Sequence, residues 1–390
     1  MFDPELYKRF DQAVARENTE CEKWDDRASF GSACALPMWV ADMDFETVPE
    51  VIAALRERVQ HGVFGYSMPT GRDKDALINW LKRRHAADFC AEDVLFSPGV
   101  VDSIYHAFVA LFAPGSKIVV QPPVYGPFFS MPKKASMQVI ENPLIDTDGV
   151  WRMDLNGLED IFKSGADGLV LCSPHNPVGR IWTREELREL GSLCKKNGVT
   201  IVSDEIHSDF ELDGQKHSCI LSVPGCEGAV QLVSATKTFN LAALRHSAII
   251  CCDADKRQRI ASQLERAMAD VNLFGRLATR IAYESGESWL DTLLVYLREN
   301  RDLMYKALKA TGKLRPVSME GTYLMWVDCR ALGMKNEALM DFFVQKAGII
   351  PSGGTFFGSQ GDGFVRLNLA TQRARVAEAA DKIFKALKAL

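Results

Sequence analysis

Five short runs of mostly apolar residues constrain the fold of this chain more than any other feature. They span residues 117–121, 168–172, 199–203, 231–234 and 247–251. The runs are continuous rather than alternating between apolar and polar residues, which is typical of strands covered on both faces. Longer helical patterns separate them. The chain therefore predicts an α/β fold, in which helices flank a mixed, mostly parallel sheet.

Three helical patterns support this prediction. Thr183, followed three residues later by Glu186, forms a capping-box pattern and predicts a helix that runs to about Asn197. A second helix is expected over residues 102–112, before Pro114 and Gly115. A third begins near Trp289 and leads into a strand over residues 322–327.

The length of 390 residues predicts more than one domain, because a single hydrophobic core rarely grows that large. Residues 46–285 are expected to form the large domain. Residues 286–390 are expected to form a smaller α/β domain at the C-terminal end. Residues 1–45 are read as an N-terminal arm that joins the smaller domain.

Charge and cysteine placement argue against several classes of protein. The net charge of -5 provides no basic surface for nucleic acid or for an anionic membrane. The sequence has no apolar stretch near the roughly 18 residues of a membrane span, and its start lacks the pattern of a secretory signal. Of the ten cysteines, Cys172, Cys251 and Cys252 fall in apolar strand-like runs, where a free cysteine acts as a small apolar side chain, so disulfides are not expected. No Cys-x-x-Cys pair occurs, so no metal site is expected. A reducing cytoplasm is the predicted location.

Lys237 is the first candidate for chemistry. It lies in Ser234-Ala-Thr-Lys237, directly after the run at residues 231–234. A lysine buried at a strand end has a lowered pKa and can act as a nucleophile, which is what pyridoxal phosphate (PLP) chemistry requires. Taken alone, the pattern favours an ordinary surface lysine.

Other candidates also follow predicted strands, where sites form in open α/β sheets. Asp204 follows the run at 199–203 and could pair with a pyridinium nitrogen, or it could simply cap the strand. Asn176 could donate a hydrogen bond to a phenolic oxygen, or it could only form a turn. Tyr125 could stack on an aromatic ring, or it could only pack in a loop.

Two further groups suit anions. Gly99, Val100 and Val101 open the helix at residue 102, and a helix N-terminus favours phosphate. Arg245 follows Lys237 by eight residues and could also bind phosphate. Arg366 lies among strand-like apolar residues, so it needs an anion. A substrate α-carboxylate fits this need, and a structural salt bridge is the alternative.

The order of these segments resembles that of the fold-type I PLP enzymes, the aspartate aminotransferase superfamily, over essentially the whole chain. The resemblance depends on Gly65-Tyr66-Ser67, Asn176-Pro177-x-Gly179, Asp204-Glu205, Ser234-x-x-Lys237 and Arg366-x-Asn368. It implies a PLP-dependent transferase fold of type I, PLP as cofactor and a small amino acid as substrate.

The resemblance also implies a role for each matching residue. Lys237 corresponds to the lysine that forms a Schiff base with PLP. Tyr66 would reach the phosphate of the neighbouring subunit, which implies a homodimer. The other implied contacts are Asp204 with the pyridinium nitrogen, Asn176 with the phenolic oxygen, Tyr125 with the ring, Gly99, Val100, Val101, Ser234 and Arg245 with the phosphate, and Arg366 with the substrate carboxylate.

Several segments are similar to one branch, the MalY/PatB cystathionine β-lyases. These segments are residues 37–45, 204–209, 237–242 and 289–291. In the second, His207 stands where typical aminotransferases have tyrosine, and it is expected to bind near the cofactor beside Asp204. The branch implies cleavage of L-cystathionine or a related cysteine S-conjugate to a thiol, pyruvate and ammonia. Trp39 and Asp42 are expected to line the substrate pocket.

Two alternatives stay open at the level of sequence. A class I/II aminotransferase would use the same residues, and Arg245 matches the phosphate-binding arginine of that class. A regulatory binding protein on the same fold is a lesser alternative. The proton donor to the leaving sulfur also stays open between Tyr66 and Lys237.

Overall fold

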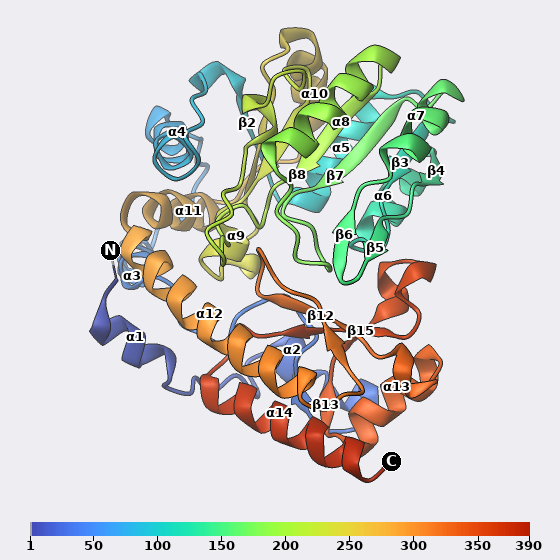
Figure 1. Ribbon diagram of the computed structural model, residues 1–390. Coiled ribbons are helices and arrows are strands. Elements are labelled where there is room, and N and C mark those ends of the chain that lie inside the picture. The colour runs from blue at the N-terminus through green and yellow to red at the C-terminus, as the bar shows by residue number, and fades with distance from the viewer. Residues whose placement is uncertain (1) are drawn as a thin grey trace.

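The larger of two main sheets contains all five predicted strands. The computed structural model describes residues 2–390 (Figure 1). In this sheet the strand order is β2-β10-β9-β8-β7-β3-β4. The strands are β2 Val94–Ser97, β3 Lys117–Val120, β4 Gln138–Glu141, β7 Gly168–Cys172, β8 Thr200–Asp204, β9 Val230–Val233 and β10 Ser247–Ile250. All pairings are parallel except those of β10, which runs antiparallel to β9 and to β2. The predicted mixed, mostly parallel sheet is confirmed.

Burial on both faces explains why these strands lack polar alternation. Leu169 and Leu171 of β7 pack on one face with the helices α7 Leu155–Lys163 and α8 Arg184–Asn197. Val170 and Cys172 of the same strand pack on the other face with α5 Val100–Leu111, α6 Pro127–Lys134 and α10 Ala254–Arg266. Successive side chains of a strand point to opposite faces, so two apolar faces require a continuous apolar run.

Helix α8 follows its predicted boundaries. The Thr183 hydroxyl accepts a hydrogen bond from Glu186 N, and Glu186 Oε2 accepts one from Thr183 N at 2.8 Å. The helix ends at Gly198, whose φ of 70° closes the last turn at no steric cost. Helix α5 begins at Val100, two residues before the predicted start.

The smaller sheet is antiparallel, in the order β11-β12-β15-β14. Its strands are β11 Arg315–Pro316, β12 Leu324–Asp328, β14 Ser352–Gly353 and β15 Phe364–Asn368. The predicted long helix is α12 Glu287–Lys309, which packs with α14 Arg373–Lys388 beside this sheet (Figure 1). The N-terminal arm joins the same part of the molecule, because β1 Leu36–Pro37 pairs with β13 Ile349–Ile350. The fold class with a smaller C-terminal α/β unit is confirmed, and the exact domain boundaries stay predictions.

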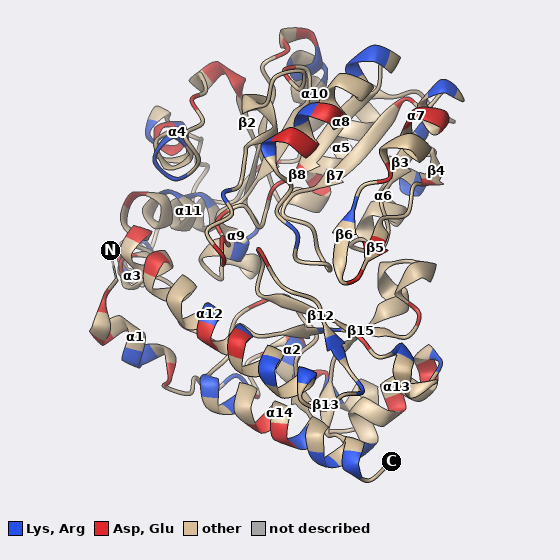
Figure 2. Cartoon of the chain, in the orientation of Figure 1, with Lys and Arg blue, Asp and Glu red and all other residues tan. Residues whose placement is uncertain are grey.

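The remaining elements complete the periphery. Helices α3 and α4 pack against α11, and β5 and β6 form a hairpin. These elements are α1 Pro4–Phe10, α2 Glu22–Asp25, α3 Pro49–His61, α4 Gly71–His85, α9 Ala235–Thr238, α11 Leu273–Ser285, α13 Asn336–Asp341, β5 Ile145–Thr147 and β6 Val150–Arg152. Figure 2 shows charges of both signs spread over the outer helices. Among the described residues, no helix has the length and apolar character needed to cross a bilayer.

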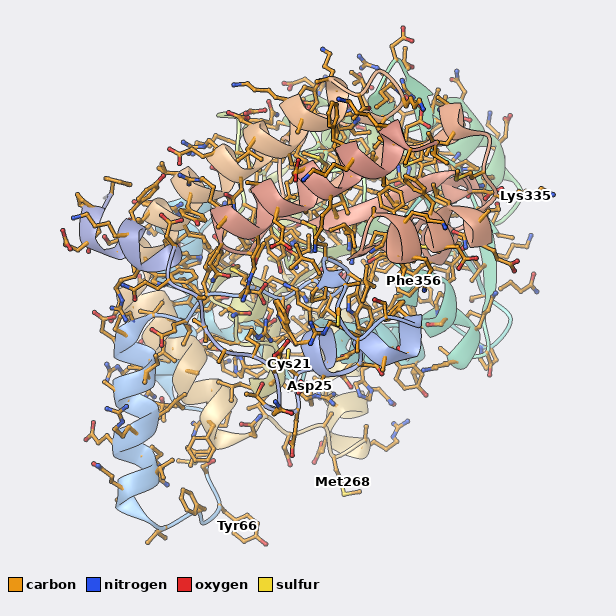
Figure 3. The ribbon with its side chains drawn as sticks, turned by 90° about the horizontal axis from the view of Figure 1, so that it is seen from below. Cys21, Asp25, Tyr66, Met268, Lys335 and Phe356 are labelled. Atoms are coloured by element: carbon orange, nitrogen blue, oxygen red, sulfur yellow. The ribbon has the colours of Figure 1, made fainter. Side chains whose placement is uncertain are left out.

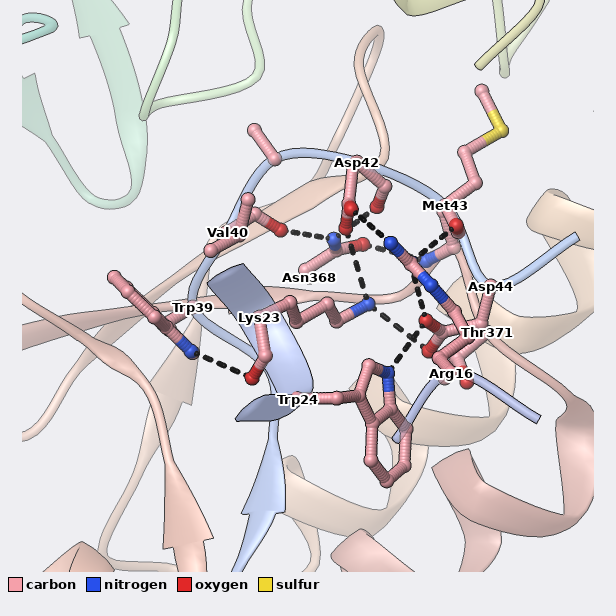
Figure 4. A network of polar contacts seen from close by, with 12 residues as sticks. Arg16, Lys23, Trp24, Trp39, Val40, Asp42, Met43, Asp44, Asn368 and Thr371 are labelled. Carbon is pink, nitrogen blue, oxygen red and sulfur yellow. Dashed lines mark hydrogen bonds and ion pairs between the residues drawn. The ribbon is translucent and has the colours of Figure 1, made fainter. Parts of the chain in front are cut away.

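A buried ionic network fixes the N-terminal arm (Figure 4). Asp44, 1% exposed, accepts hydrogen bonds from Trp24 Nε1 at 2.9 Å, Lys23 Nζ at 3.0 Å and Arg16 Nη1 at 2.9 Å. Burial raises the pKa of Asp44, but the Lys23 ammonium and the Trp24 N–H outweigh it and lower the value to about 2. Asn368 at the end of β15 donates to the carbonyl oxygens of Val40 and Asp42, at 2.5 and 2.6 Å. The arm is thereby tied to the smaller sheet.

We predict that Asp44→Ala lowers the free energy of unfolding at pH 7 by about 3–5 kcal/mol, because it leaves the buried Lys23 ammonium without its main partner. The folded-state pKa of Asp44 lies below its ordinary value, so its contribution is present above about pH 4 and disappears as the pH falls towards about 2. Urea titrations across this pH range measure the difference between variant and wild type.

The matched control is Asp270→Ala at an exposed position, which should leave the unfolding midpoint unchanged. A difference between Asp44→Ala and wild type that stayed constant down to pH 2 would contradict the ionic account.

Candidate active site

Two adjoining cavities open beside Lys237, at the carboxyl ends of β7, β8 and β9. The smaller, 210 Å³, is lined by the predicted residues Gly99, Val100, Val101, Tyr125, Asn176, Asp204, His207, Lys237 and Arg245. The larger, 790 Å³, is lined by Trp39, Asp42, Tyr125, Lys237 and Arg366, among others. Tyr125 and Lys237 line both. The structure thus gathers residues from positions 39 to 366 around one amine.

Lys237 lies in α9, a single helical turn that follows β9. Ser234 caps this turn: its Oγ accepts a hydrogen bond from Thr236 N at 3.1 Å and donates one to His246 O at 2.6 Å. The Lys237 ammonium donates to the carbonyl oxygen of Ala41 at 2.6 Å. Burial lowers the pKa of Lys237 to about 8, although the neighbouring Asp42 carboxylate opposes this. Near neutral pH an appreciable fraction of the amine is therefore unprotonated.

Asp204 ends β8 and is 6% exposed. One carboxylate oxygen accepts a hydrogen bond from Ile206 N at 3.0 Å. Burial raises the pKa of Asp204 to about 7, against the effect of that hydrogen bond. A cationic group placed in the cavity would return the carboxyl to its ionised form.

His207 lines the same cavity and is buried. Burial lowers its pKa to about 3, so the imidazole is neutral. Its ring lies edge-on to Tyr323, with centroids 5.8 Å apart. Nδ1 has no partner among the described residues. Among the described residues, His207 forms no hydrogen bond with Asp204.

Arg366 lies in β15 and is 3% exposed. It donates hydrogen bonds to Asn176 Oδ1 at 3.0 Å, Trp39 O at 2.7 Å and Ser352 Oγ at 3.0 Å. All three acceptors are neutral, and no carboxylate within residues 2–390 forms an ion pair with this guanidinium. Burial lowers the pKa of Arg366 to about 10. A buried cation without an anionic partner favours an anionic ligand. Of the two roles considered for Arg366, binding of a substrate carboxylate therefore fits better than a structural salt bridge.

The N-terminus of α5 supplies a second anion site. Gly99 precedes the helix without a side-chain cap. A Cβ at this position would lie 3.0 Å from Asp102 Oδ2, so a larger residue here would require the Asp102 side chain to shift. Arg245 lies beside it and donates to Asp102 Oδ2 at 2.9 Å. The N–H groups of the first turn and the guanidinium together suit a phosphate.

Two predicted residues lie apart from the cavity lining. Ser234 acts through the turn that it caps. Tyr66 is fully exposed, on a segment at residues 62–70 that projects from the body of the molecule (Figure 3). Within one chain, Tyr66 therefore contributes nothing to the cavity.

The sequence did not predict several groups that contact the site residues. The carbonyl oxygen of Ala41 accepts from Lys237 Nζ and from the Tyr323 hydroxyl, and a backbone acceptor leaves no mark on residue type. Ser352 orients Arg366, and Phe356, 53% exposed, lies edge-on to Tyr125 at 6.0 Å. Only the folded chain brings them together.

One buried cluster outside the cavity has metal-ligand chemistry. Glu205, His217 and Cys219 place their ligand atoms within 4.8 Å of one another. Glu205 Oε2 and His217 Nε2 already form a hydrogen bond of 2.9 Å, so these two atoms are occupied by each other.

The fold and these groups define a class: an α/β enzyme of the type I transferase fold, with a buried lysine amine between an acid and an anion site. The chain belongs to the aminotransferase class I and II family, whose model matches residues 37–383.

Relatives within that family extend over the whole chain. The sequence is 39% identical over 384 residues to cystathionine β-lyase PatB of Bacillus subtilis, covering 97% of this chain and 99% of the relative. It is 31% identical to protein MalY of Escherichia coli, covering 98% and 99%. Cystalysin from Treponema denticola, whose structure contains pyridoxal 5′-phosphate, superposes with a TM-score of 0.94 at 31% identity, covering 100% and 99%.

We predict that Lys237 in the cofactor-free protein reacts with a small acylating reagent near pH 8, where about half of its amine is unprotonated. Trace labelling followed by mass spectrometry measures the extent of reaction against pH. Labelling of Lys335, exposed on the surface, provides the reference. Equal pH profiles for the two lysines would contradict the effect of burial on Lys237.

Proposed function

We propose that this protein is a PLP-dependent carbon–sulfur β-lyase. It cleaves L-cystathionine or a related cysteine S-conjugate, with water, to a thiol, pyruvate and ammonia. The observation that carries the proposal is one cavity system that joins the Lys237 amine, the Asp204 carboxyl and the Arg366 guanidinium. This guanidinium has no anionic partner among the described residues. The lyase names of the PatB relative and of other full-length relatives support the type of reaction.

The groups in the smaller cavity fit PLP. Lys237 provides the amine for its aldehyde. Asp204 has a pKa raised by burial and forms no ion pair among the described residues, which suits a pyridinium nitrogen. The bound cofactor supplies an electrophilic carbon and an electron sink for charge that develops at the substrate Cα. The other contacts we assign are Asn176 to the phenolic oxygen, Tyr125 to the ring face, His207 beside Asp204, and Gly99, Val100, Val101 and Arg245 to the phosphate. Ser234 supports this site through the turn that it caps.

The chain's own residues then act on the substrate in order. Arg366 binds the α-carboxylate, and its hydrogen bonds to Asn176 and Ser352 hold the guanidinium plane in place. Lys237, with its lowered pKa, removes the Cα proton as general base. The Cβ–S bond breaks, and the thiol leaves with a proton from Lys237 or from Tyr66 of the neighbouring subunit.

The larger cavity accommodates the part of the substrate beyond sulfur. Trp39 and Asp42 form its wall near Arg366. Trp39 is fixed by a hydrogen bond from Nε1 to Lys23 O at 3.2 Å, and Asp42 by its ion pair with Arg16 at 2.7 Å. A volume of 790 Å³ exceeds what a single small amino acid fills, which suits an S-conjugate.

We place the site at the interface of a homodimer. Tyr66 shares its projecting segment with Val63, Phe64 and Met68, and all four side chains are more than half exposed. Exposed apolar groups on a projecting segment favour burial against another protein surface. A second copy of the chain would receive Tyr66 at its own phosphate site.

A reducing cytoplasm is the location we propose. The ten cysteines are unpaired, and most of them are buried as small apolar side chains.

The decisive assay incubates the purified protein with L-cystathionine, with and without a keto acid. We expect pyruvate and thiol in equal amounts without the keto acid. Lys237→Ala should lose the visible absorbance of the bound cofactor and about 10³-fold or more of the activity, because the base is gone.

Each alternative has its own outcome in this assay. Turnover only with an added keto acid would identify an aminotransferase. The observation that supports this alternative is the similarity to a putative aminotransferase from Clostridium difficile, which is 37% identical with a TM-score of 0.94. Tight binding of a protein partner without turnover in either condition would favour a regulatory protein.

We also predict that Tyr66→Ala and Lys237→Ala variants, each inactive alone, regain about a quarter of wild-type activity when their subunits are mixed. After random exchange of equal amounts, about half of all dimers contain one subunit of each variant, and each of these has one intact site of its two. Activity is measured after subunit exchange, with Met268→Ala, exposed elsewhere on the surface, replacing Tyr66→Ala as the control. Full activity of Tyr66→Ala alone would exclude a role for this residue.

A further inference from the structure

A second carboxylate, Asp209, lies five residues after Asp204 in the sequence. It contacts the turn that carries Lys237 on the side away from the cavity. Asp209, 4% exposed, accepts hydrogen bonds from three side chains. The Thr238 hydroxyl donates at 2.7 Å, His85 Nε2 at 2.9 Å and Trp80 Nε1 at 3.1 Å. Thr238 directly follows Lys237, whereas Trp80 and His85 belong to α4.

The turn that carries Lys237 needs such support. Helix α9 contains only the four residues Ala235–Thr238. A single helical turn has little stability of its own, because forming the first turn fixes several dihedral angles for one hydrogen bond. Phe239, next in the chain, packs edge-on against Trp80 with centroids 5.4 Å apart. Two consecutive residues after Lys237 therefore contact the same patch formed by α4 and Asp209.

The Asp209 carboxylate stays ionised in this buried position. Burial raises its pKa, but His85 and Thr238 outweigh burial and hold the value below its ordinary range. The charged and titratable groups around it include Arg84 and His85 of α4, Tyr283 of α11 and Cys219, with Glu211 3.9 Å from His85 Nδ1. An ionised acceptor forms stronger hydrogen bonds than a neutral one, so this carboxylate is a firm anchor.

We propose that Asp209 is a positioning residue that holds the Lys237 amine in the cavity by anchoring Thr238 to α4. This inference rests on the proposed function of Lys237 as the residue that takes the cofactor and moves the Cα proton. Asp209 touches neither cavity and acts only through Thr238.

The anchoring helix also connects two parts of the proposed site. Helix α4 begins at Gly71, directly after the segment at 62–70 that carries Tyr66. Its first turn is fixed by Asp73, which pairs with Arg280 of α11 at 3.0 Å. The C-terminal half of α4 thus contacts Asp209 beside the lysine turn, and its N-terminal end continues directly from the projecting segment.

The test compares Thr238→Val, Thr238→Ser and Asp209→Asn in the cofactor-loaded enzyme. Valine matches threonine in shape and removes only the hydroxyl donor, while serine keeps it. We expect Thr238→Val to lower kcat about tenfold or more with little change in KM, because a displaced base affects the chemical step rather than binding. Thr238→Ser should stay within about twofold of wild type.

A second readout is independent of turnover. The visible band that forms when PLP is added to the cofactor-free protein should appear about tenfold more slowly in Thr238→Val, because its amine is less often correctly placed. Asp209→Asn should slow it similarly. The double variant should be no slower than Thr238→Val alone, since valine already removes the contact that Asp209→Asn weakens.

Thr292→Val is the matched control, since Thr292 is also buried and hydrogen-bonded but lies in α12, where its hydroxyl accepts from Asp3 N and donates to Ser288 O. Wild-type rates of band formation and of kcat in Thr238→Val would overturn the inference, as would an equal loss in Thr292→Val. If the wild-type protein formed no visible band with PLP, the proposed function would fail instead.

Discussion

The hydrogen bond from Lys237 to the carbonyl oxygen of Ala41 is the contact on which the site depends. The same oxygen accepts from the Tyr323 hydroxyl, so one acceptor joins the large sheet, the N-terminal arm and the strand region of the smaller sheet. Asn240 strengthens this junction by exchanging hydrogen bonds with the backbone of Met43 at 3.0 Å in each direction. The amine is placed by parts of the chain almost two hundred residues apart.

Burial shifts the pKa values of Lys237, Arg366 and Asp204 in the direction that favours the neutral form of each. It lowers the pKa of Lys237 to about 8 and that of Arg366 to about 10, and it raises that of Asp204 to about 7. Each group is thereby brought closer to its neutral form, because a low-dielectric interior disfavours isolated charge. A ligand with a cationic ring nitrogen and an anionic carboxylate would compensate Asp204 and Arg366. The energetic preference for such a ligand is therefore present in the protein before it binds.

The sequence predicted the central strands well and the edge strands poorly. Strands β7, β8 and β9 are covered on both faces, so they appear as continuous apolar runs. The edge strands β2 and β4 are only partly buried and were not predicted: the apolar run of β2 has only three residues, and β4 has a polar residue at each end. The same logic applies to the site: Asn176, Asp204 and Lys237 follow central strands, and parallel strands bring their carboxyl ends to one edge. Residues that act through the backbone or from behind, such as Ala41 and Asp209, leave no comparable pattern.

By itself the sequence determined the central strands of the sheet, two of the helices that cover it and the residue types gathered at its edge, because periodic burial and strand-end placement are local properties. Only the tertiary structure decided that Arg366 has neutral neighbours, that Lys237 is held by Ala41, and that Asp209 anchors the turn beside it. It also left Tyr66 exposed at the end of a projecting segment. These features depend on distances between segments far apart in the chain, and such distances are fixed only when the two sheets and the arm pack together.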